Sequence, residues 1–491
     1  MESARSSLLA VRNRAMALSL AAWTISIWLV VMSMPSSAQT VTVVHNFTAN
    51  GFSQDPSLVA LAQGRDVALY GTTQGAGGDP DYGSVFRTTT SGLGGELHAF
   101  NKVSDGQNPS AGLTVGSDGS LYGIAGGGSL SKGVLFRITS HGAYSVLHNF
   151  AGGSDGQSPR SAPILAADGN MYGTTEGALT TDSGATVYRY NASGGLTTIH
   201  QFDQNTAILA PLTQGTDGYL YGTAYYSGPN FCGSIFKMTT SGTVLLTYSF
   251  PCGEGGANPA APLVQASDGN FYGTAEQGGT LANGLVFMMT PKGKVTVLYN
   301  FKGGSDGATP DAGLAEGTDG LLYGTTGGGG SSGVGTLYQI STTGTYKSLY
   351  TFTSATGQYP LAGLLQHTNG TFYGAAERGG TQGYGTIYSL DMGMTPFITF
   401  VQPMGRVGKT AQVLGQSLTG TTAVTFNGVA ATSFKVVSDT FMTAVVPTGA
   451  TTGPVVVTTP IGALTSNKNF RIIGAASSAT KSGAVRPRRS Q

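Results

Sequence analysis

The chain contains few charged residues. Asp, Glu, Lys and Arg make up 10% of its 491 residues, whereas about a quarter is usual for a soluble protein. The formal net charge is +1, and its positive part is concentrated at the two ends: Arg5, Arg12 and Arg14 precede residue 38, and residues 474–491 carry four more basic residues. The body between the ends is therefore weakly acidic and has no basic face, which argues against a nucleic-acid partner.

The sequence also lacks the patterns of fibrous, disordered and catalytic chains. Its 77 glycines do not follow the period of collagen, and its 22 tyrosines and 21 phenylalanines argue against disorder. No Ser–His–Asp set, nucleotide-binding loop or close pair of carboxylates can be assigned from spacing. Few charges together with many Gly, Thr, Tyr and Phe residues indicate an all-β chain of short strands joined by tight turns.

The amino terminus has the layout of a secretory signal peptide. Three arginines precede an apolar run from Ala15 to Met32, and residues 35–38 (Pro-Ser-Ser-Ala) place small residues before a cut after Ala38. We expect a protein that is secreted or held in the cell envelope, with no membrane insertion after cleavage. Because the apolar run is long, an uncleaved N-terminal anchor is the alternative.

A Tyr-Gly pair recurs at an almost constant spacing of 49 to 52 residues. Each pair opens a Tyr-Gly-Thr-Thr-like segment, which is followed by a Gly-x-Val-Phe segment, a strand ending in Phe and a Pro-x-Ala-Gly-Leu segment. Asp-Gly turns such as Asp118-Gly119 then suit two-residue hairpins. Four hairpin-connected strands per repeat predict the blade of a β-propeller, and seven repeats predict seven blades over residues 39–393. The repeated tyrosines are Tyr70, Tyr122, Tyr172, Tyr221, Tyr272, Tyr323 and Tyr373.

The register of the repeat predicts how the ring of blades closes. The strand from Val41 to Phe47 precedes the first Tyr-Gly pair, and the seventh repeat has no Phe-ending strand of its own after Tyr388. We therefore expect residues 41–47 to supply the outermost strand of the last blade, with the Ala-Gly-Leu strand innermost in every blade.

The two cysteines occupy facing positions of one predicted hairpin. Cys232 opens the third strand of a blade and Cys252 follows the fourth, around a turn centred on Ser241-Gly242. Because export permits oxidation, we predict a disulfide between them; two free thiols are the alternative.

The motif Leu-Tyr-Gly-Thr-Thr, followed by Gly-x-Val-Phe, Val-Leu-His-x-Phe and Pro-x-Ala-Gly-Leu, resembles the GloVer (choice-of-anchor) tandem-repeat family of bacterial cell envelopes. The resemblance covers about residues 41–391 and implies export, without any catalytic residue. Members often carry a C-terminal sorting anchor, but residues 474–491 have no apolar stretch and are expected to form a disordered basic tail. The only tryptophans, Trp23 and Trp28, lie in the signal segment, which argues against WD, quinone-cofactor and sialidase-type propellers.

Residues 395–472 resemble an IPT/TIG domain, an immunoglobulin-like β-sandwich. The matching residues include Pro403-x-Gly405, residues 423–428 (Ala-Val-Thr-Phe-Asn-Gly), Val446-Pro447 and Phe470. Such domains usually act as spacers or binding modules, so this resemblance implies no catalysis.

The histidines and the Asp-Gly turns are not expected to bind metal. A histidine lies two residues before the Phe of the outer strand in four repeats, where the other repeats have Tyr; this choice indicates packing with a hydrogen-bonded ring edge. Copies on different outer strands lie too far apart to share an ion, and one Asp per turn is too few for calcium. We therefore predict no metal and no cofactor. The residues at this position are His45, His98, His148, His200, Tyr248, Tyr299 and Tyr350.

Acidic residues on the variable loops are the candidate ligand contacts. We expect these loops on one face of the propeller near its axis, the default location of a ligand site. The leading hypothesis is an exported binding or scaffold protein for a glycan, a peptide or a cell-envelope partner. A polysaccharide-active hydrolase or lyase is an alternative if Glu276 and Glu377 converge to within about 10 Å, and a purely structural envelope protein is another. The candidates are Glu176, Glu276 and Glu377, four residues after the repeat tyrosine, and Asp105, Asp155 and Asp306, in the loops between blades.

Overall fold

The computed structural model describes residues 39–48, 56, 60–75, 82–177 and 184–473. Regular structure in these ranges is almost entirely β, with three short 3-10 helices: η1 (Gly153–Asp155), η2 (Gly253–Gly255) and η3 (Gly304–Asp306). The all-β prediction is therefore confirmed. The predicted signal peptide and the predicted basic tail both lie outside the described residues. None of the helices in the described ranges has the length and apolar character of a membrane span.

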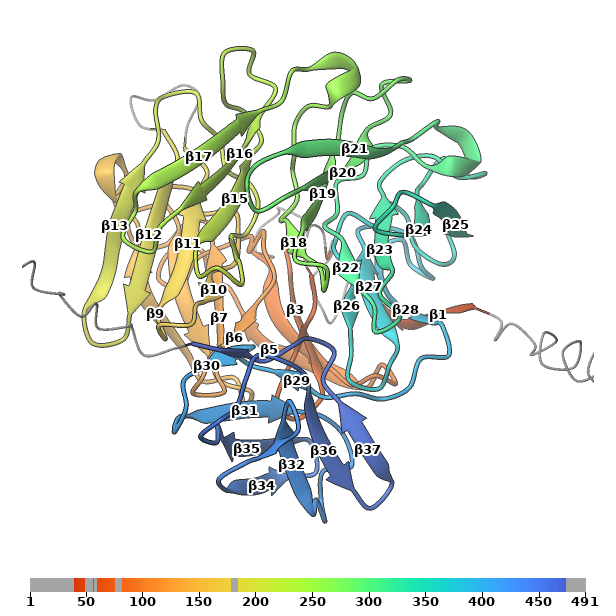
Figure 1. The fold of residues 1–491 in the computed structure, drawn as a ribbon. Helices are drawn as coiled ribbons and strands as arrows, with labels where there is room; N and C mark the ends of the chain where they lie inside the picture. Colours follow the sequence, from red (N-terminus) through yellow and green to blue (C-terminus); the bar gives the residue numbers. More distant parts are fainter. Residues whose placement is uncertain (1–38, 49–55, 57–59, 76–81, 178–183, 474–491) are drawn as a thin grey trace, which may run out of the picture. The chain divides into compact units, whose positions relative to one another are not determined.

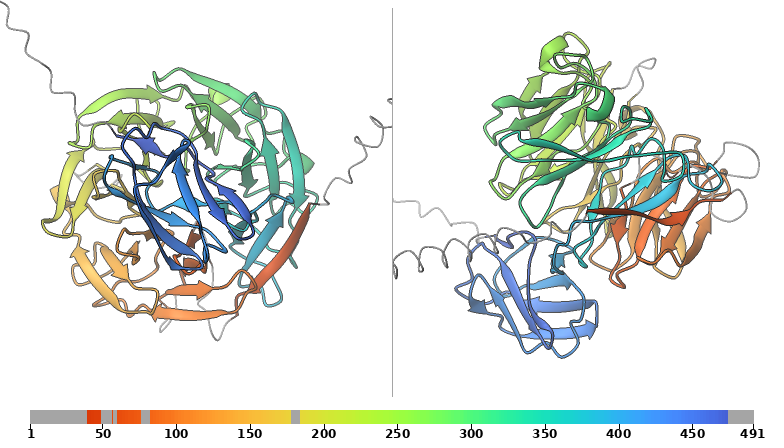
Figure 2. Two further views of the ribbon diagram at one scale, coloured as in Figure 1. Left: turned by 60° about the horizontal axis from the view of Figure 1, so that its bottom comes forward. Right: turned by 90° about the vertical axis from the view of Figure 1, so that its right-hand side faces the viewer.

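Residues 40–391 form seven four-stranded sheets, called sheets 1 to 7 in chain order (Figure 1). Neighbouring strands are antiparallel, and the two-residue inner strand of each sheet pairs with the Tyr-Gly strand. The left view of Figure 2 shows these sheets following one another around a common centre. In sequence order the strands are β1 (Thr40–Asn46), which belongs to sheet 7; β2 (Ala62–Gln63), β3 (Leu69–Thr73), β4 (Ser84–Thr88) and β5 (Gly94–Ala99) of sheet 1; β6 (Thr114–Val115), β7 (Leu121–Ala125), β8 (Val134–Ile138) and β9 (Tyr144–Asn149) of sheet 2; β10 (Ile164–Leu165), β11 (Met171–Thr175), β12 (Thr186–Asn191) and β13 (Gly195–Gln201) of sheet 3; β14 (Thr213–Gln214), β15 (Leu220–Ala224), β16 (Ser234–Met238) and β17 (Val244–Ser249) of sheet 4; β18 (Val264–Gln265), β19 (Phe271–Ala275), β20 (Leu285–Met289) and β21 (Val295–Asn300) of sheet 5; β22 (Ala315–Glu316), β23 (Leu322–Thr326), β24 (Thr336–Ile340) and β25 (Tyr346–Thr351) of sheet 6; and β26 (Leu365–Gln366), β27 (Phe372–Ala376) and β28 (Thr386–Asp391) of sheet 7.

The Tyr-Gly-Thr-Thr motif is explained by contacts of the second strand with its neighbours. A Cβ atom on Gly71 would lie 2.5 Å from the ring of Phe86 on β4, so only glycine lets this ring pack across the strand. The next residue, Thr72, donates a hydrogen bond of 2.8 Å to the carbonyl of Ala111 in sheet 2. The motif therefore packs one sheet and ties it to the next.

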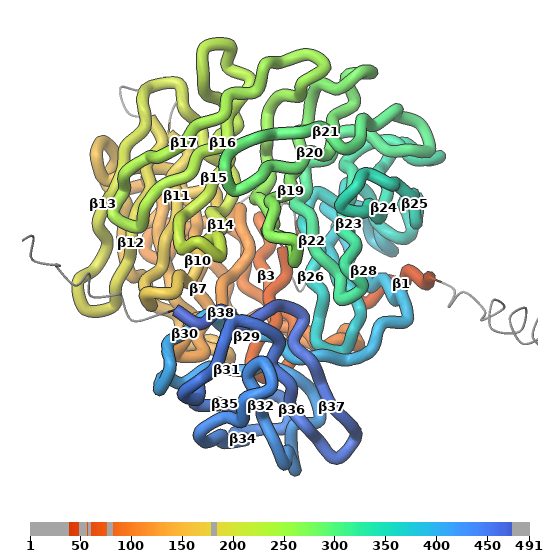
Figure 3. The backbone as a smooth tube through the Cα atoms, in the orientation of Figure 1, coloured from red at the N-terminus to blue at the C-terminus, as the bar shows by residue number. Residues whose placement is uncertain are grey.

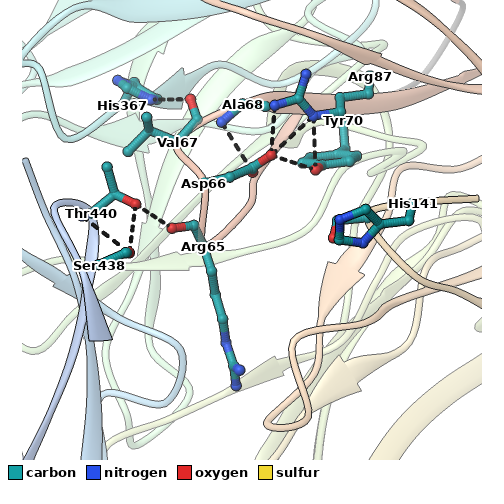
Figure 4. Close-up of polar contacts among 11 residues, drawn as sticks. Arg65, Asp66, Val67, Ala68, Tyr70, Arg87, His141, His367, Ser438 and Thr440 are labelled. Atoms are coloured by element: carbon teal, nitrogen blue, oxygen red, sulfur yellow. Dashed lines mark hydrogen bonds and ion pairs between the residues drawn. The ribbon is translucent and has the colours of Figure 1, made fainter. Parts of the chain in front are cut away.

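The turn before the Tyr-Gly strand is held by its aspartate, as Figure 4 shows for Asp66. The Asp66 carboxylate accepts hydrogen bonds from the Tyr70 hydroxyl (3.0 Å) and from Arg87 (2.7 Å), and the carbonyl of Val67 accepts one from His367 (3.0 Å). The same Tyr-to-Asp bond, 2.6 to 3.3 Å long, recurs in sheets 2 to 6, which explains the spacing of these residues in the repeat. The other pairs are Tyr122–Asp118, Tyr172–Asp168, Tyr221–Asp217, Tyr272–Asp268 and Tyr323–Asp319.

The first strand, β1, belongs to the same sheet as the last strands of the repeat region. Strand β1 is the outer neighbour of β28, so sheet 7 has the order β1-β28-β27-β26 and joins the two ends of the repeat region (Figure 3). Phe47, directly after β1, packs against Phe86 of sheet 1 with ring centroids 5.5 Å apart. On the inner side, the Gln63 amide exchanges hydrogen bonds of 2.8 and 3.0 Å with Thr368 of sheet 7. Sheets 7 and 1 are thus joined at both their inner and outer ends.

The apolar core of this region lies between neighbouring sheets. One cluster combines Tyr70 and Phe100 of sheet 1 with Leu121 and Phe136 of sheet 2. The later clusters repeat this arrangement up to the contact between sheets 6 and 7. Each sheet depends on its neighbours for burial, which explains why the repeats form a closed series.

The predicted disulfide is present between Cys232 and Cys252, whose Cα atoms lie 5.5 Å apart. Cys252 has a φ of 69°, and the corresponding loop positions of sheets 2 and 5 are Gly152 and Gly303, with φ of 82° and 76°. In sheet 4 a cysteine therefore occupies a backbone conformation that favours glycine.

Residues 399–472 form two further four-stranded sheets and one short parallel pair, β30–β38. The apolar side chains of the two sheets share one core, which includes Val413, Phe426, Met442 and Phe470. The strands are β29 (Thr399–Phe400), β30 (Met404–Gly405), β31 (Thr410–Leu414), β32 (Ala423–Phe426), β33 (Val429–Ala430), β34 (Phe434–Ser438), β35 (Phe441–Val445), β36 (Val455–Thr459), β37 (Gly462–Thr465) and β38 (Arg471–Ile472), in the sheet orders β29-β31-β35-β34 and β33-β32-β36-β37.

Candidate functional site

The His or Tyr of each outer strand packs on the phenylalanine two residues later. In all seven sheets the two rings meet edge to face, with centroids 4.5 to 5.5 Å apart, so the packing prediction is confirmed. The pairs are His45–Phe47, His98–Phe100, His148–Phe150, His200–Phe202, Tyr248–Phe250, Tyr299–Phe301 and Tyr350–Phe352.

Three of the predicted ligand contacts are hydrogen-bonded to these outer-strand rings. Asp105 accepts a hydrogen bond of 2.9 Å from His98, Asp155 one of 2.9 Å from His148, and Asp306 one of 2.6 Å from the Tyr299 hydroxyl. Each aspartate also accepts a bond from the backbone N–H four residues earlier, which stabilises its own loop. In the described part of the chain, no group of three or more His, Cys, Asp and Glu side chains could hold a metal ion.

The three predicted glutamates have different surroundings. Glu176 forms an ion pair with Arg160, with 2.8 Å between Oε2 and Nε, and Glu377 forms one with Arg378 at 3.6 Å. Glu276 accepts a hydrogen bond from the Tyr225 phenol. Burial is the first cause that raises the pKa of Tyr225, followed by this bond to Glu276, so the phenol remains a proton donor at neutral pH.

The inner segments of all seven sheets surround a cavity of about 590 Å³. It is therefore an axial cavity, lined by the Pro-x-Ala-Gly-Leu segments that precede the inner strands. Its walls are mainly small or apolar, for example Ala111, Leu209, Ala260 and Leu361. Glu176 lies in this lining, whereas the Asp105, Asp155 and Asp306 carboxylates are engaged by outer-strand rings and backbone N–H groups.

Asp311 is an ionisable residue of the cavity wall that the sequence prediction did not include. It occupies the x position of Pro-x-Ala-Gly-Leu in sheet 6, twelve residues before Tyr323. Burial, followed by the neighbouring Glu276 carboxylate, raises the pKa of Asp311 to about 8. An acid of this kind changes its charge near neutral pH, which is typical of a functional site.

A sequence signal for Asp311 did exist. The x position also holds Ser110, Arg160, Leu209, Ala260 and Leu361, so it carries charge in sheets 3 and 6 of the described repeats. A carboxylate beside Ala-Gly-Leu is unusual where chains crowd around an axis, because burial is costly for a charge. This position lies in the short segment before the inner strand, outside the longer loops that carry the predicted acidic residues.

The repeat places the chain in a known family. The Gloeobacter/Verrucomicrobia repeat family model matches residues 27–213 and 207–437. The chain belongs to the Gloeobacter/Verrucomicrobia repeat family. This confirms the family resemblance of the repeat region. No curated protein matches this Gloeobacter/Verrucomicrobia repeat protein.

Solved structures that resemble this repeat protein are propeller-like and distant in sequence. A copper complex of a fungal alcohol oxidase of the AA5 family has a TM-score of 0.50 at 13% identity, over 89% of this chain and 100% of that one. Virginiamycin B lyase from Staphylococcus aureus has a TM-score of 0.49 at 15% identity, over 72% and 98%. A gluconolactonase from Xanthomonas campestris has a TM-score of 0.38 at 12% identity, over 73% and 92%. At such identities the likeness concerns the fold alone.

Proposed function

We propose that this chain is an exported, non-enzymatic binding protein that holds a small, largely apolar ligand in the axial cavity of a seven-bladed β-propeller. The propeller comprises residues 39–393, with sheets 1 to 7 as its blades. An IPT/TIG-type immunoglobulin-like sandwich, residues 395–472, follows as a spacer or second binding module. Residues 1–38 are the signal peptide, cleaved after Ala38 on export to the cell envelope or the medium.

The observation that carries this proposal is the axial cavity. A volume of about 590 Å³ lies within the range of ligand pockets, which typically combine apolar walls with a few polar groups. Here the walls are mainly Ala, Leu, Pro and Gly, and the ionisable groups are Arg160, Glu176 and Asp311. A site of this composition gains most of its binding free energy from apolar contact, with the charged groups setting orientation.

The lining also discriminates between the partner classes that the sequence suggests. A glycan presents many hydroxyl groups, and burying them against Ala and Leu walls would leave hydrogen bonds unmade. A small apolar molecule, or one apolar side chain of a peptide or envelope protein, avoids this cost. We therefore propose a small apolar molecule or one apolar side chain, in preference to a glycan, as the ligand of the axial cavity.

The proposal is tested by blocking the cavity. The purified protein is screened by thermal shift against small apolar molecules, peptides and cell-wall glycans, in parallel with Ala260→Trp, which places an indole ring at the cavity wall, and Ala151→Trp, which adds the same ring at an exposed position. We expect ligands that stabilise the parent and Ala151→Trp but not Ala260→Trp. Ligands that bind all three proteins equally would contradict an axial site, and the absence of any ligand would favour a purely structural envelope protein.

A second candidate function is acid–base catalysis by a hydrolase or lyase. The observation that favours it is the pair of acidic groups around Asp311: its pKa of about 8 lets it donate a proton at neutral pH, and Glu276 is the charged neighbour that raises this pKa. The pair replaces Glu276 and Glu377 as the carboxylates to test. Mass spectrometry of every bound ligand after incubation decides this point, because breakdown products that disappear in Asp311→Asn would establish catalysis.

A further inference from the structure

The same two repeat positions carry opposite charges in sheet 3 but only one charge in sheet 6. In sheet 3 the x position is Arg160 and the position four residues after the repeat tyrosine is Glu176, and the two form an ion pair of 2.8 Å. In sheet 6 the equivalent residues are Asp311 and Gly327. Sheet 3 therefore neutralises its axial charge internally, whereas sheet 6 places a carboxylate opposite a residue without a side chain.

The Asp311 carboxylate packs directly against the backbone of Gly327. A Cβ atom at position 327 would lie 2.8 Å from Asp311 Oδ2 and 2.7 Å from Leu361 Cδ2. Any larger residue would have to displace one of these side chains. The glycine thus makes room for the Asp311 carboxylate beside Leu361, and both residues line the cavity.

Among the described residues, the other ionisable groups near Asp311 supply no unpaired positive charge. Glu276 is acidic, and Tyr225 is a neutral phenol that donates to Glu276. Arg160, the only cation among the described residues of the cavity lining, is already paired with Glu176. With Asp311 ionised, the lining carries one cation and two carboxylates, and Glu276 adds a further negative charge nearby.

We propose that the axial cavity binds a small organic amine, whose ammonium group pairs with Asp311 and whose apolar body contacts the Ala and Leu walls. This inference rests on the proposed function, because it names the ligand class of the same cavity. An ammonium group replaces the cation that sheet 6 lacks, and a charged hydrogen bond away from bulk water is stronger than a neutral one. A metal ion is a poorer occupant, since the walls offer few oxygen ligands.

The number of protons released on binding tests the pairing of the ammonium group with Asp311 independently of the affinity. Asp311 binds a proton at neutral pH, with Arg160 and Glu176 in the same cavity lining and the Glu276 carboxylate acting on it from nearby, so an ammonium ligand must displace that proton as it binds. Well below the pKa of Asp311, at pH 6, we expect the release of close to one proton per amine bound. Affinity for the amine should rise between pH 6 and pH 8.

The test compares three compounds with one apolar body: 1-naphthylmethylamine, 1-naphthylmethanol and 1-naphthoate. Isothermal titration calorimetry at pH 8, with the parent protein, Asp311→Asn and the exposed control Asp391→Asn, measures each affinity. We expect the parent and Asp391→Asn to bind the amine at least tenfold more tightly than the alcohol, and the carboxylate most weakly. Asp311→Asn should lose at least tenfold in amine affinity and bind the alcohol within twofold of the parent.

The outcomes separate this inference from the function on which it rests. If amine and alcohol bind equally, or if Asp311→Asn keeps its amine affinity, the amine inference is overturned; alcohol binding that Ala260→Trp abolishes would still support the cavity as a binding site. If none of the three compounds binds, the amine inference also falls. The wider screen with Ala260→Trp then decides the proposed function independently.

Discussion

The pH dependence of stability gives the most direct test of the surroundings of Asp311. Its pKa rises from an ordinary 3.8 to about 8, so the folded protein holds the proton more tightly than the unfolded chain. The resulting contribution to stability is complete below pH 3.8 and is lost as the pH rises through 8. At about 1.4 kcal/mol per pKa unit, the upper limit of this contribution to the free energy of unfolding is roughly 6 kcal/mol. Because the side chain is only partly buried, solvent screening reduces it, and we expect about 2 kcal/mol between pH 5 and pH 8.

Asp311→Asn removes this loss, since asparagine has nearly the same shape and does not ionise. Thermal unfolding of the ligand-free protein at pH 5, 6, 7 and 8 should give a Tm difference between variant and parent that grows with pH by several degrees. Glu276→Gln should reduce the pH dependence of the parent, because the Glu276 charge contributes to the shift. Asp391→Asn, at the exposed end of β28, is the matched control. A Tm difference between Asp311→Asn and the parent that stays the same at all four pH values would refute the reasoning.

Three further predictions concern the fold. Replacing Cys232 and Cys252 by serine should lower the free energy of unfolding by about 3 kcal/mol, given a sequence separation of 20. In chemical denaturation, a variant with serine at 232 and glycine at 252 should recover part of this loss, and a double serine variant as stable as the parent would contradict the prediction. Val67→Gly should stabilise by about 0.5–1 kcal/mol, because Val67 has a φ of 53°; Val67→Ala keeps the strained conformation and should show no such gain. Deletion of residues 39–48 should expose the edge of β28 and remove Phe47 from the core. Loss of the Phe47 ring alone should lower the free energy of unfolding by about 3–5 kcal/mol. Size-exclusion chromatography should show aggregation that a synthetic 39–48 peptide relieves, whereas a stable monomer would count against β1 as the closing strand.

Much of the fold could be predicted because the repeat is local and regular. The Tyr-Gly pairs, the turn aspartates and the Phe-ending strands each recur at fixed offsets, so the pairing within each sheet follows from hairpin geometry. The disulfide and the closing strand followed from register in the same way. Asp66 was the one turn aspartate that the pattern missed, because Val67 replaces the glycine of the Asp-Gly pair.

The candidate site could be predicted only in part. Of the glutamates four residues after the repeat tyrosine, Glu176 lines the axial cavity. The loop aspartates are candidates because polar loops often carry function. However, whether an acidic side chain contacts a ligand or a neighbouring ring depends on the direction in which it points. The Asp105 carboxylate accepts a hydrogen bond from His98 of its own sheet.

Periodicity in the chain thus specified the strands, their order within each sheet and the closure between first and last repeats, because each depends on residues a short, repeated distance apart. The axial cavity arises only when seven inner segments, spread over three hundred residues, converge on one axis. The charge imbalance at Asp311 likewise depends on Glu276, Gly327 and Leu361 from three successive sheets. Burial and electrostatic coupling are properties of distances in space, so these features of the site were decided by tertiary packing.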